Sequence, residues 1–228
     1  MSSKSAQAID SVYDEAKNFL IIGLTGRTGS GCSTAANKLC STSLDVPFDG
    51  YEGLTENELK KHKIIHKYLS GEAWTAFYKV EARSIITYHL LLLTRDLFLK
   101  YVIEIVGAGI NVEKAEQAYD DLTSVCEELQ RLHAFRKSGD LGATEPWIDL
   151  YFEKLPVATE IIKACLGGAN FTKLYQSAGD NIRSSGIANS RTFNVGELFG
   201  FPKHLNFVIK LVRSSTKSKG IPCRIVID

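Results

Sequence analysis

A glycine-rich segment directly after an apolar run carries the residues best suited to bind phosphate. Gly26, Gly31 and Ser33 have the spacing G-x4-G-x-S. An apolar run expected to be a buried strand, Phe19–Ile22, precedes them, and a helix is expected to follow. Strand, glycine-rich loop and helix in this order are typical of a Walker A loop. Its glycines let backbone N–H groups turn toward phosphate oxygens, and the helix N-terminus adds partial positive charge, so the segment predicts a nucleotide site.

One position departs from that pattern, because Cys32 stands where a Walker A loop carries lysine. The lysine normally holds the β- and γ-phosphates as a point charge, so its loss predicts nucleotide binding with little phosphoryl transfer. Arg27 is a candidate to replace part of the missing charge, while Ser33 or Thr34 is expected to place a hydroxyl on Mg²⁺. The nucleotide-binding residues predicted here are Gly26, Arg27, Thr28, Gly29, Ser30, Gly31, Cys32, Ser33 and Thr34.

Two other interpretations of this segment stay open. One is a Gly/Ser-rich turn between strand and helix that binds no ligand. The other is that Cys32 is a reactive thiol activated by the helix N-terminus. The plainer alternative for Cys32 is a small residue that only fills the loop.

Two further segments complete such a site. The apolar strand Ile225–Ile227 ends in Asp228, which is the Walker B pattern of a carboxylate that holds Mg²⁺ through water. We therefore expect Ser33 and Asp228 to bind the metal of a nucleotide, either Mg²⁺–NTP or Mg²⁺–dNTP. Arg183 lies in the Gly/Ser-rich run Gly179–Gly186 and is a candidate to close over phosphates, as arginines of kinase lids do. The plainer interpretation of Ile225–Asp228 is a strand that precedes a polar turn. The plainer interpretation of Gly179–Gly186 is the solvated end of a helix.

Other chemistry has less support in the residues. His62 and His66 are four apart on an expected helix, but no third ligand follows, so a solvated basic face is a better interpretation than a metal site. The sequence has no H-x-E and no P-C-x-x-C, which excludes a zinc deaminase site within this chain. It also has no G-x-S-x-G nucleophile elbow. We predict neither a catalytic residue nor a zinc site here.

Length and composition describe a chain that can bury one sizeable core. It has 228 residues, 44% of them hydrophobic, and a net charge of +1 that provides no bulk field to recruit nucleic acid or membrane. We expect no specific nucleic-acid binding and no membrane association. Five cysteines without C-x-x-C spacing, and a polar N-terminus without an apolar signal core, indicate a reduced cytoplasmic protein. The most apolar stretch, Ile85–Val106, contains charged residues and predicts a core helix.

The elements around the loop are expected to be mostly helices. Apolar runs predict strands over Phe19–Thr25, Ala76–Val80 and Arg224–Asp228, and a loop is expected over Leu44–Gly53. Two or three parallel strands with many helices indicate an α/β protein. We predict a P-loop NTPase or kinase-like parallel sheet with a large helical insertion over about residues 111–178, all within one domain of residues 1–228.

Apolar periodicity and capping residues define the helices. Thr55 with Glu58 three residues later is a capping-box pattern, and Asn111 caps a second helix that Gly139 ends. Gly107 to Gly109 ends the helix before it. The helices are expected over Ser5–Lys17, Ser33–Ser41, Thr55–Leu69, Ala82–Val106, Asn111–Gly139, Glu145–Cys165, Ala169–Ile182 and Pro202–Ser214.

Four segments of the chain resemble one known family. The loop with Cys32 in place of lysine, Gly179–Gly186, Phe207–Arg213 and Arg224–Asp228 resemble the N-terminal half of bacterial phage-defence deoxycytidylate deaminases. In that family a kinase-like P-loop domain precedes a zinc-dependent deaminase domain, and the whole protein converts dCTP or dCMP to the uracil form, which depletes the pool for phage replication. The loop alone also resembles dephospho-coenzyme A kinase and similar small-molecule kinases, which carry the lysine.

The resemblance implies a nucleotide-binding regulatory module, in which the loop senses an NTP or dNTP and biases an attached deaminase domain. It also implies a longer bacterial protein with the deaminase domain as partner. Because the expected helices outnumber the strands available to bury them, we also expect an exposed apolar patch near Asp228 that favours self-association. Two alternatives stay open: a phosphotransferase that acts on a nucleotide or small metabolite, and a helical interaction scaffold with a vestigial loop. The site residues implied are Gly26, Gly29, Gly31, Ser33 and Thr34, with Arg183 and Asp228.

Overall fold

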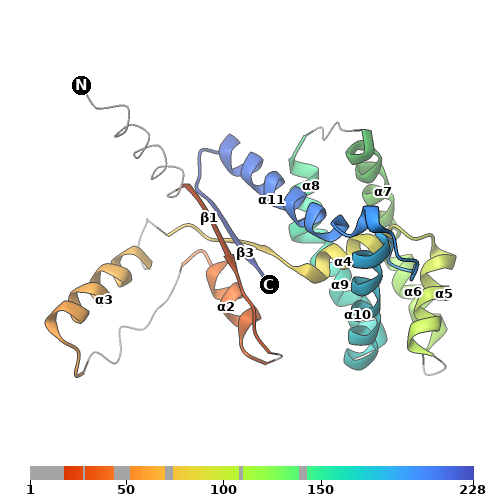
Figure 1. Cartoon of the computed structure of the whole chain (residues 1–228), viewed down its shortest axis with the longest axis horizontal. Helices are drawn as coiled ribbons and strands as arrows, with labels where there is room; N and C mark the ends of the chain where they lie inside the picture. The colour runs from red at the N-terminus through yellow and green to blue at the C-terminus, as the bar shows by residue number, and fades with distance from the viewer. Residues whose placement is uncertain (1–17, 28, 44–51, 70–73, 108–109, 139–142) are drawn as a thin grey trace. The chain divides into compact units, whose positions relative to one another are not determined.

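The computed structural model describes residues 18–27, 29–43, 52–69, 74–107, 110–138 and 143–228. It is an α/β structure, mostly helical, with one small parallel sheet (Figure 1). The chain divides into two compact units, a sheet unit of residues 1–79 and 216–228 and a helical unit of residues 80–215. The α/β class is thus confirmed, while the kinase-like P-loop fold stays a prediction. The helix expected over Ser5–Lys17 and most of the loop expected over Leu44–Gly53 lie outside the described residues.

The sheet has three strands, each at a place where an apolar run predicted one. Its order is β1-β3-β2, so the C-terminal strand lies in the middle. β1 and β3 pair in parallel, with Phe19 opposite Cys223 and Gly23 opposite Ile227. The strands are β1 (Phe19–Gly23), β2 (Tyr78–Val80) and β3 (Cys223–Ile227).

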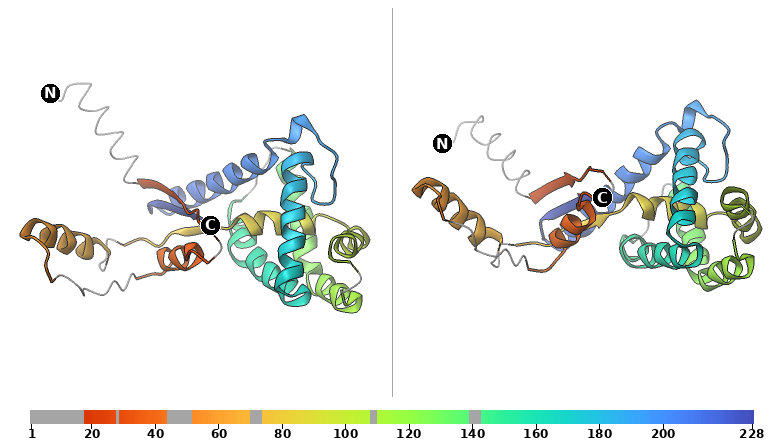
Figure 2. Two further views of the ribbon diagram at one scale, coloured as in Figure 1. Left: turned by 60° about the horizontal axis from the view of Figure 1, so that its bottom comes forward. Right: turned by 90° about the horizontal axis from the view of Figure 1, so that it is seen from below.

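Helix α2 (Cys32–Leu39) lies alongside the strands and covers a small core (Figures 1 and 2). Ala36 of this helix is fully buried and packs with Phe77 and Val226. Partly buried apolar side chains surround these three: Ile22, Leu24, Leu39, Cys40 and Trp74. The predicted helix after the loop is confirmed, and its N-terminus points to the edge of the sheet at which β1 ends.

Helix α3 (Glu56–Leu69) begins with the predicted capping box. The N–H of Thr55 donates to Oε2 of Glu58 at 2.8 Å, and the N–H of Glu58 approaches Oγ1 of Thr55 at 3.4 Å. These bonds satisfy donors that have no partner within the first turn of a helix. The predicted end at Leu69 is also confirmed.

The helical unit is built on α4, α9 and α10, which pack on one another, with α5 against α10 and α6 against α9. Large side chains such as Trp147, Tyr88 and Leu150 are completely buried in this unit. The insertion expected over residues 111–178 falls inside this unit. The helices are α4 (Ala82–Leu91), α5 (Arg95–Val106), α6 (Val112–Asp121), α7 (Thr123–Ser138), α8 (Glu145–Asp149), a π-helical turn (Leu150–Lys154), α9 (Leu155–Leu166), α10 (Gly168–Ser185), a 3-10 turn (Val195–Glu197) and α11 (Gly200–Ser218).

Two long helices that the periodicity predicted are each two shorter helices. The run Ala82–Val106 breaks before α5, where Thr94 has an extended backbone with φ −63° and ψ 159°. The run that starts at Asn111 breaks at Leu122, which has φ −97° and ψ 3°. The predicted caps are nevertheless in place: Oδ1 of Asn111 accepts from the N–H of Lys114 at 3.0 Å.

The two breaks contact each other, which gives their physical cause. The hydroxyl of Tyr119 donates to the carbonyl of Leu93 at 2.8 Å, and Nε of Arg95 donates to Oδ1 of Asp120 at 2.8 Å. Both bonds join a residue at one break to a residue at the other, so they stabilise the two turns together. Tertiary contacts therefore override a continuous apolar period, which reports local amphipathicity alone.

Candidate functional site

The loop that joins β1 to α2 turns at two glycines. Gly29 and Gly31 have φ values of +83° and +85°, a region that side-chain-bearing residues rarely adopt. The N–H of Ser30 donates to the carbonyl of Arg27 at 2.9 Å, which closes a tight turn. Gly31 is the N-cap residue before α2 and has no side chain to cap the helix. The N–H groups of the first helical turn are therefore directed at the space in front of the helix. This is the arrangement of backbone donors that an anion requires.

Gly26 has no room for a side chain. A Cβ atom there would lie 2.2 Å from Oγ of Ser30 and 3.1 Å from Sγ of Cys32. Oγ of Ser30 and Sγ of Cys32 are hydrogen-bonded at 3.3 Å. The cysteine that replaces the expected lysine therefore contacts the side chain of Ser30, and the glycine at position 26 is a steric requirement of this conformation.

The parallel pairing brings Asp228 to the start of the loop. Gly23 lies opposite Ile227, and the N–H of Leu24 donates to the carbonyl of Ile227 at 2.9 Å. Asp228 therefore follows at the edge of the sheet from which the loop leaves, which is where parallel α/β sheets bind ligands. Within the described part of the chain, Oδ2 of Asp228 is buried and has no hydrogen-bond partner. A buried carboxylate oxygen is costly unless a ligand, an ion or water satisfies it.

The polar side chains of the first helical turn are accessible. Ser33 and Thr34 are exposed, as is Arg27 in the loop, while Thr28 lies outside the described residues. Lys38, further along α2, is also exposed. The loop thus offers hydroxyls and backbone donors, with Arg27 as its own cation.

One cation near α2 was not found by sequence reasoning. Nζ of Lys79 on β2 donates to Oδ1 of Asn37 on α2 at 2.8 Å. Asn37 lies five residues past the start of α2, which is about 7.5 Å along the helix. The position of Lys79 depends on the pairing of β2 with β3, and no local pattern in the sequence encodes that pairing.

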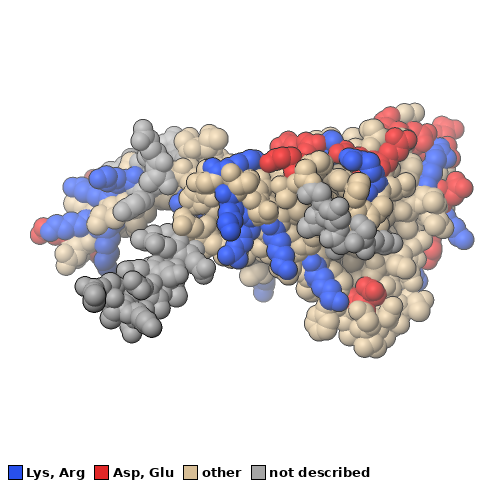
Figure 3. Space-filling model, turned by 90° about the horizontal axis from the view of Figure 1, so that it is seen from above, with Lys and Arg blue, Asp and Glu red and all other residues tan. Residues whose placement is uncertain are grey.

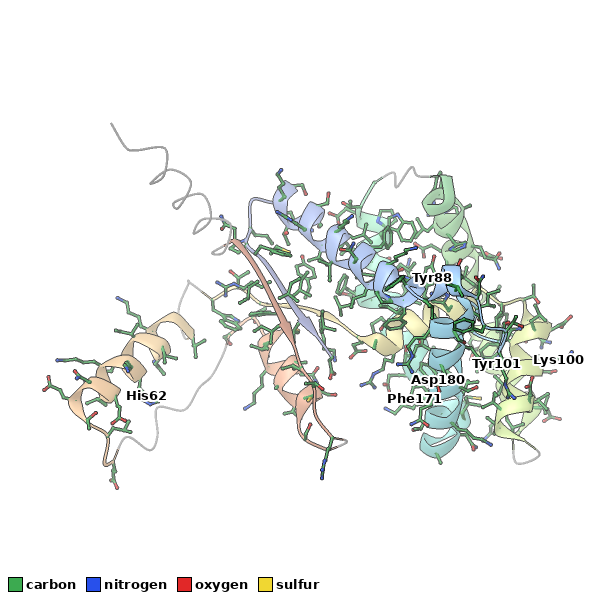
Figure 4. All side chains as sticks on the ribbon, in the orientation of Figure 1. His62, Tyr88, Lys100, Tyr101, Phe171 and Asp180 are labelled. Carbon is green, nitrogen blue, oxygen red and sulfur yellow. The ribbon has the colours of Figure 1, made fainter. Side chains whose placement is uncertain are left out.

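Arg183 lies in the other unit, on the last turn of α10. Its guanidinium pairs with the carboxylate of Asp180, which is labelled in Figure 4, and both side chains are exposed. The Gly/Ser-rich loop expected around Arg183 is wrong, because α10 continues to Ser185 and ends at Gly186 with φ +79°. The contact of Arg183 with phosphates stays a prediction, since Arg183 and the loop of residues 26–34 belong to different units.

A buried histidine and tyrosine cluster in the helical unit also escaped sequence reasoning. His204 is 1% exposed and lies between the hydroxyl of Tyr151 and Nε2 of His89, the latter at 3.0 Å from its Nδ1. The hydroxyl of Tyr88, labelled in Figure 4, lies 2.6 Å from Nδ1 of His133. Because these groups satisfy one another, we interpret the cluster as a hydrogen-bonded core.

Side-chain clusters that could hold a metal ion, and helices that could span a membrane, are absent from the residues that the structure describes. No group of three or more His, Cys, Asp or Glu side chains there is arranged to hold a metal ion, His62 and His66 included. A Mg²⁺ held by Ser33, by phosphate oxygens and through water by Asp228 does not need such a group. Among the described helices, none combines the length and the apolar character needed to cross a bilayer.

No family model, curated protein or solved structure matches this chain. The resemblance to phage-defence deaminases therefore stays a prediction from the residues, and the candidate site rests on its own geometry.

Proposed function

We propose that the loop of residues 26–34 binds the phosphates of a nucleotide polyphosphate together with Mg²⁺. The observation that carries this proposal is the position of Asp228, whose buried Oδ2 has no partner in the described structure and which adjoins the start of a glycine-rich loop. Two glycines with positive φ and the uncapped N-terminus of α2 support it, since they supply backbone donors for phosphate oxygens.

The chemistry available to this loop favours binding over turnover. Loss of the Walker A lysine removes a charge-assisted contact of about 1.5–3 kcal/mol, which implies micromolar rather than nanomolar affinity. The transition state of phosphoryl transfer spreads charge over the γ-phosphoryl oxygens, and Cys32 supplies no positive charge to stabilise it. Binding without turnover suits a sensor, and the family resemblance supports a regulatory role toward an attached nucleotide deaminase domain.

Phosphoryl transfer is the second candidate, and Lys79 is the observation that favours it. A lysine held against α2 by Asn37 is a cation from outside the loop, as a kinase without the Walker A lysine requires. Measurement of phosphate release, with and without acceptor nucleosides, distinguishes this candidate from a sensor.

Calorimetric titration with a panel of NTPs and dNTPs in Mg²⁺ tests the proposal. Gly26→Ala places a methyl group 2.2 Å from Oγ of Ser30, so it is expected to weaken binding at least about tenfold. Gly23→Ala is the matched control, because a Cβ atom at Gly23 meets nothing within 4 Å. Absence of heat with every nucleotide at millimolar concentration, or equal affinities for the two variants, would overturn the proposal.

A further inference from the structure

Helix α11 carries a row of cations along one exposed face. Successive residues of a helix lie about 100° apart around its axis. In α11 an arc of about 80° around the axis, bounded by Arg213 and Lys203, contains five positions. Four of the five are cationic, and all five are exposed. No Asp or Glu occurs anywhere in α11. The row consists of Lys203, Asn206, Lys210, Arg213 and Lys217, and we call it the α11 stripe.

The opposite face of α11 fixes the orientation of the stripe. Val208, Leu211 and Val212 are buried. The ring of Phe207 packs on the ring of Trp147 with centroids 5.0 Å apart. A helix anchored by such a core cannot rotate its cations away from solvent, so the stripe is a fixed linear surface.

Figure 3 looks onto the face of the molecule that carries α11. Lysine and arginine side chains follow one another along the part of this view in which α11 lies. The net charge of +1 therefore conceals a local separation of charge. A surface of one sign attracts a polyanion even when the whole chain is nearly neutral.

We propose that the α11 stripe binds the phosphate backbone of a nucleic acid without reading its sequence. From Lys203 to Lys217 the stripe is about 21 Å long, which matches about six phosphates at 3.4 Å per phosphate on one strand. Lysine and arginine neutralise phosphates, and the amide of Asn206 can donate to a phosphate oxygen. This proposal does not rest on the function of the nucleotide loop.

The composition of the stripe favours a nucleic acid over an anionic membrane. Helices that bind membrane surfaces insert large apolar side chains between lipid headgroups. The stripe has none, because its fifth position is Asn206. Electrostatic contact with regularly spaced phosphates is the interaction that remains.

Fluorescence anisotropy with a labelled 20-nucleotide single strand of dT tests this inference. With four cations engaged, log K is expected to fall with log salt concentration at a slope of about −3. The double variant Lys203→Gln/Lys210→Gln is expected to bind at least about tenfold more weakly, with a slope smaller by about 1.4. Gly26→Ala is expected to bind the strand like wild type.

A matched control variant distinguishes binding by the α11 stripe from binding by exposed lysines elsewhere. Lys61→Gln/Lys63→Gln removes two exposed lysines from α3 and is expected to leave binding of the strand unchanged. Circular dichroism melts verify that both double variants are folded. The inference is contradicted if the strand does not bind, if both double variants lose affinity equally, or if only phosphatidylglycerol vesicles bind to wild type and release on loss of the stripe.

Discussion

The two units of this chain differ in how much apolar surface they bury. In the helical unit Trp147, Leu150 and Leu155 are completely buried. In the sheet unit, Leu20 and Ile21 of β1 remain 43% and 37% exposed, and the core cluster under α2 has three buried members. Burial of apolar surface is the main favourable term in folding. Among the described residues the helical unit therefore buries more apolar surface, while the sheet unit presents backbone and polar groups at one edge.

Buried polar atoms without a hydrogen-bond partner occur in both units among the described residues, the hydroxyl of Ser84 in the helical unit and a carboxylate oxygen of Asp228 in the sheet unit, and the carboxylate is the more costly of the two. In the helical unit, Oγ1 of Thr87 lies 2.6 Å from Oγ1 of Thr159 and 2.7 Å from the hydroxyl of Tyr175. In the sheet unit, Oδ2 of Asp228 is buried without a partner in the described structure. A satisfied network stabilises a core, whereas an unsatisfied carboxylate beside a glycine loop is the kind of local cost that functional sites carry.

Core truncation gives the largest expected contrast between the units. Leu155→Ala removes a completely buried side chain and is expected to lower the free energy of unfolding by about 2–5 kcal/mol. Ile21→Ala, on the exposed strand β1, is expected to cost less than about 1 kcal/mol. Urea denaturation followed by circular dichroism measures both. Equal losses would show that β1 is as well buried as α9.

Alkaline pH is expected to lower the free energy of unfolding through one buried tyrosine of the helical unit, Tyr175. Burial raises the pKa of Tyr175 to about 12, so the folded state holds this proton more tightly than the unfolded state. The resulting stability is complete below about pH 10 and is lost as pH rises through about 12, by roughly 3 kcal/mol in total. Tyr175→Phe removes the titrating group, so its free energy of unfolding is expected to fall less steeply over this range.

Urea titrations at several pH values between 9 and 12 measure that difference. At pH 7 the variant is expected to lose about 1 kcal/mol, because the hydrogen bond between Tyr175 and Thr87 is removed. Parallel stability profiles for wild type and variant across the alkaline range would show that Tyr175 does not titrate with unfolding.

Local signals in the sequence predicted local structure well. Thr55 with Glu58, and Asn111 alone, identify helix starts because their side chains bond backbone donors within three residues. The breaks at Thr94 and Leu122 were missed, since the contacts that stabilise them, Tyr119 to Leu93 and Asp120 to Arg95, join one break to the other. Such contacts join residues that are distant along the chain, and amphipathic periodicity carries no information about them.

The residues of the candidate site differ in the same way in how far the sequence could predict them. The glycines from Gly26 to Gly31 could be recognised from spacing, because a phosphate loop is one continuous segment. Asp228 could be proposed from its strand, but its position beside the loop follows from the parallel register of β1 and β3. Lys79 could not be found at all, because it reaches Asn37 only through the pairing of β2 in the sheet.

The central claim is that backbone donors of the loop bind nucleotide phosphates, and amide chemical shifts test it most directly. In a ¹⁵N-labelled sample titrated with Mg²⁺–ATP and Mg²⁺–dCTP, the largest shift changes are expected at the amides of residues 26–34. Amides of the buried helices α9 and α10 are expected to change little. Contrary results are unchanged loop amides at millimolar nucleotide, or shifts that centre on the helical unit.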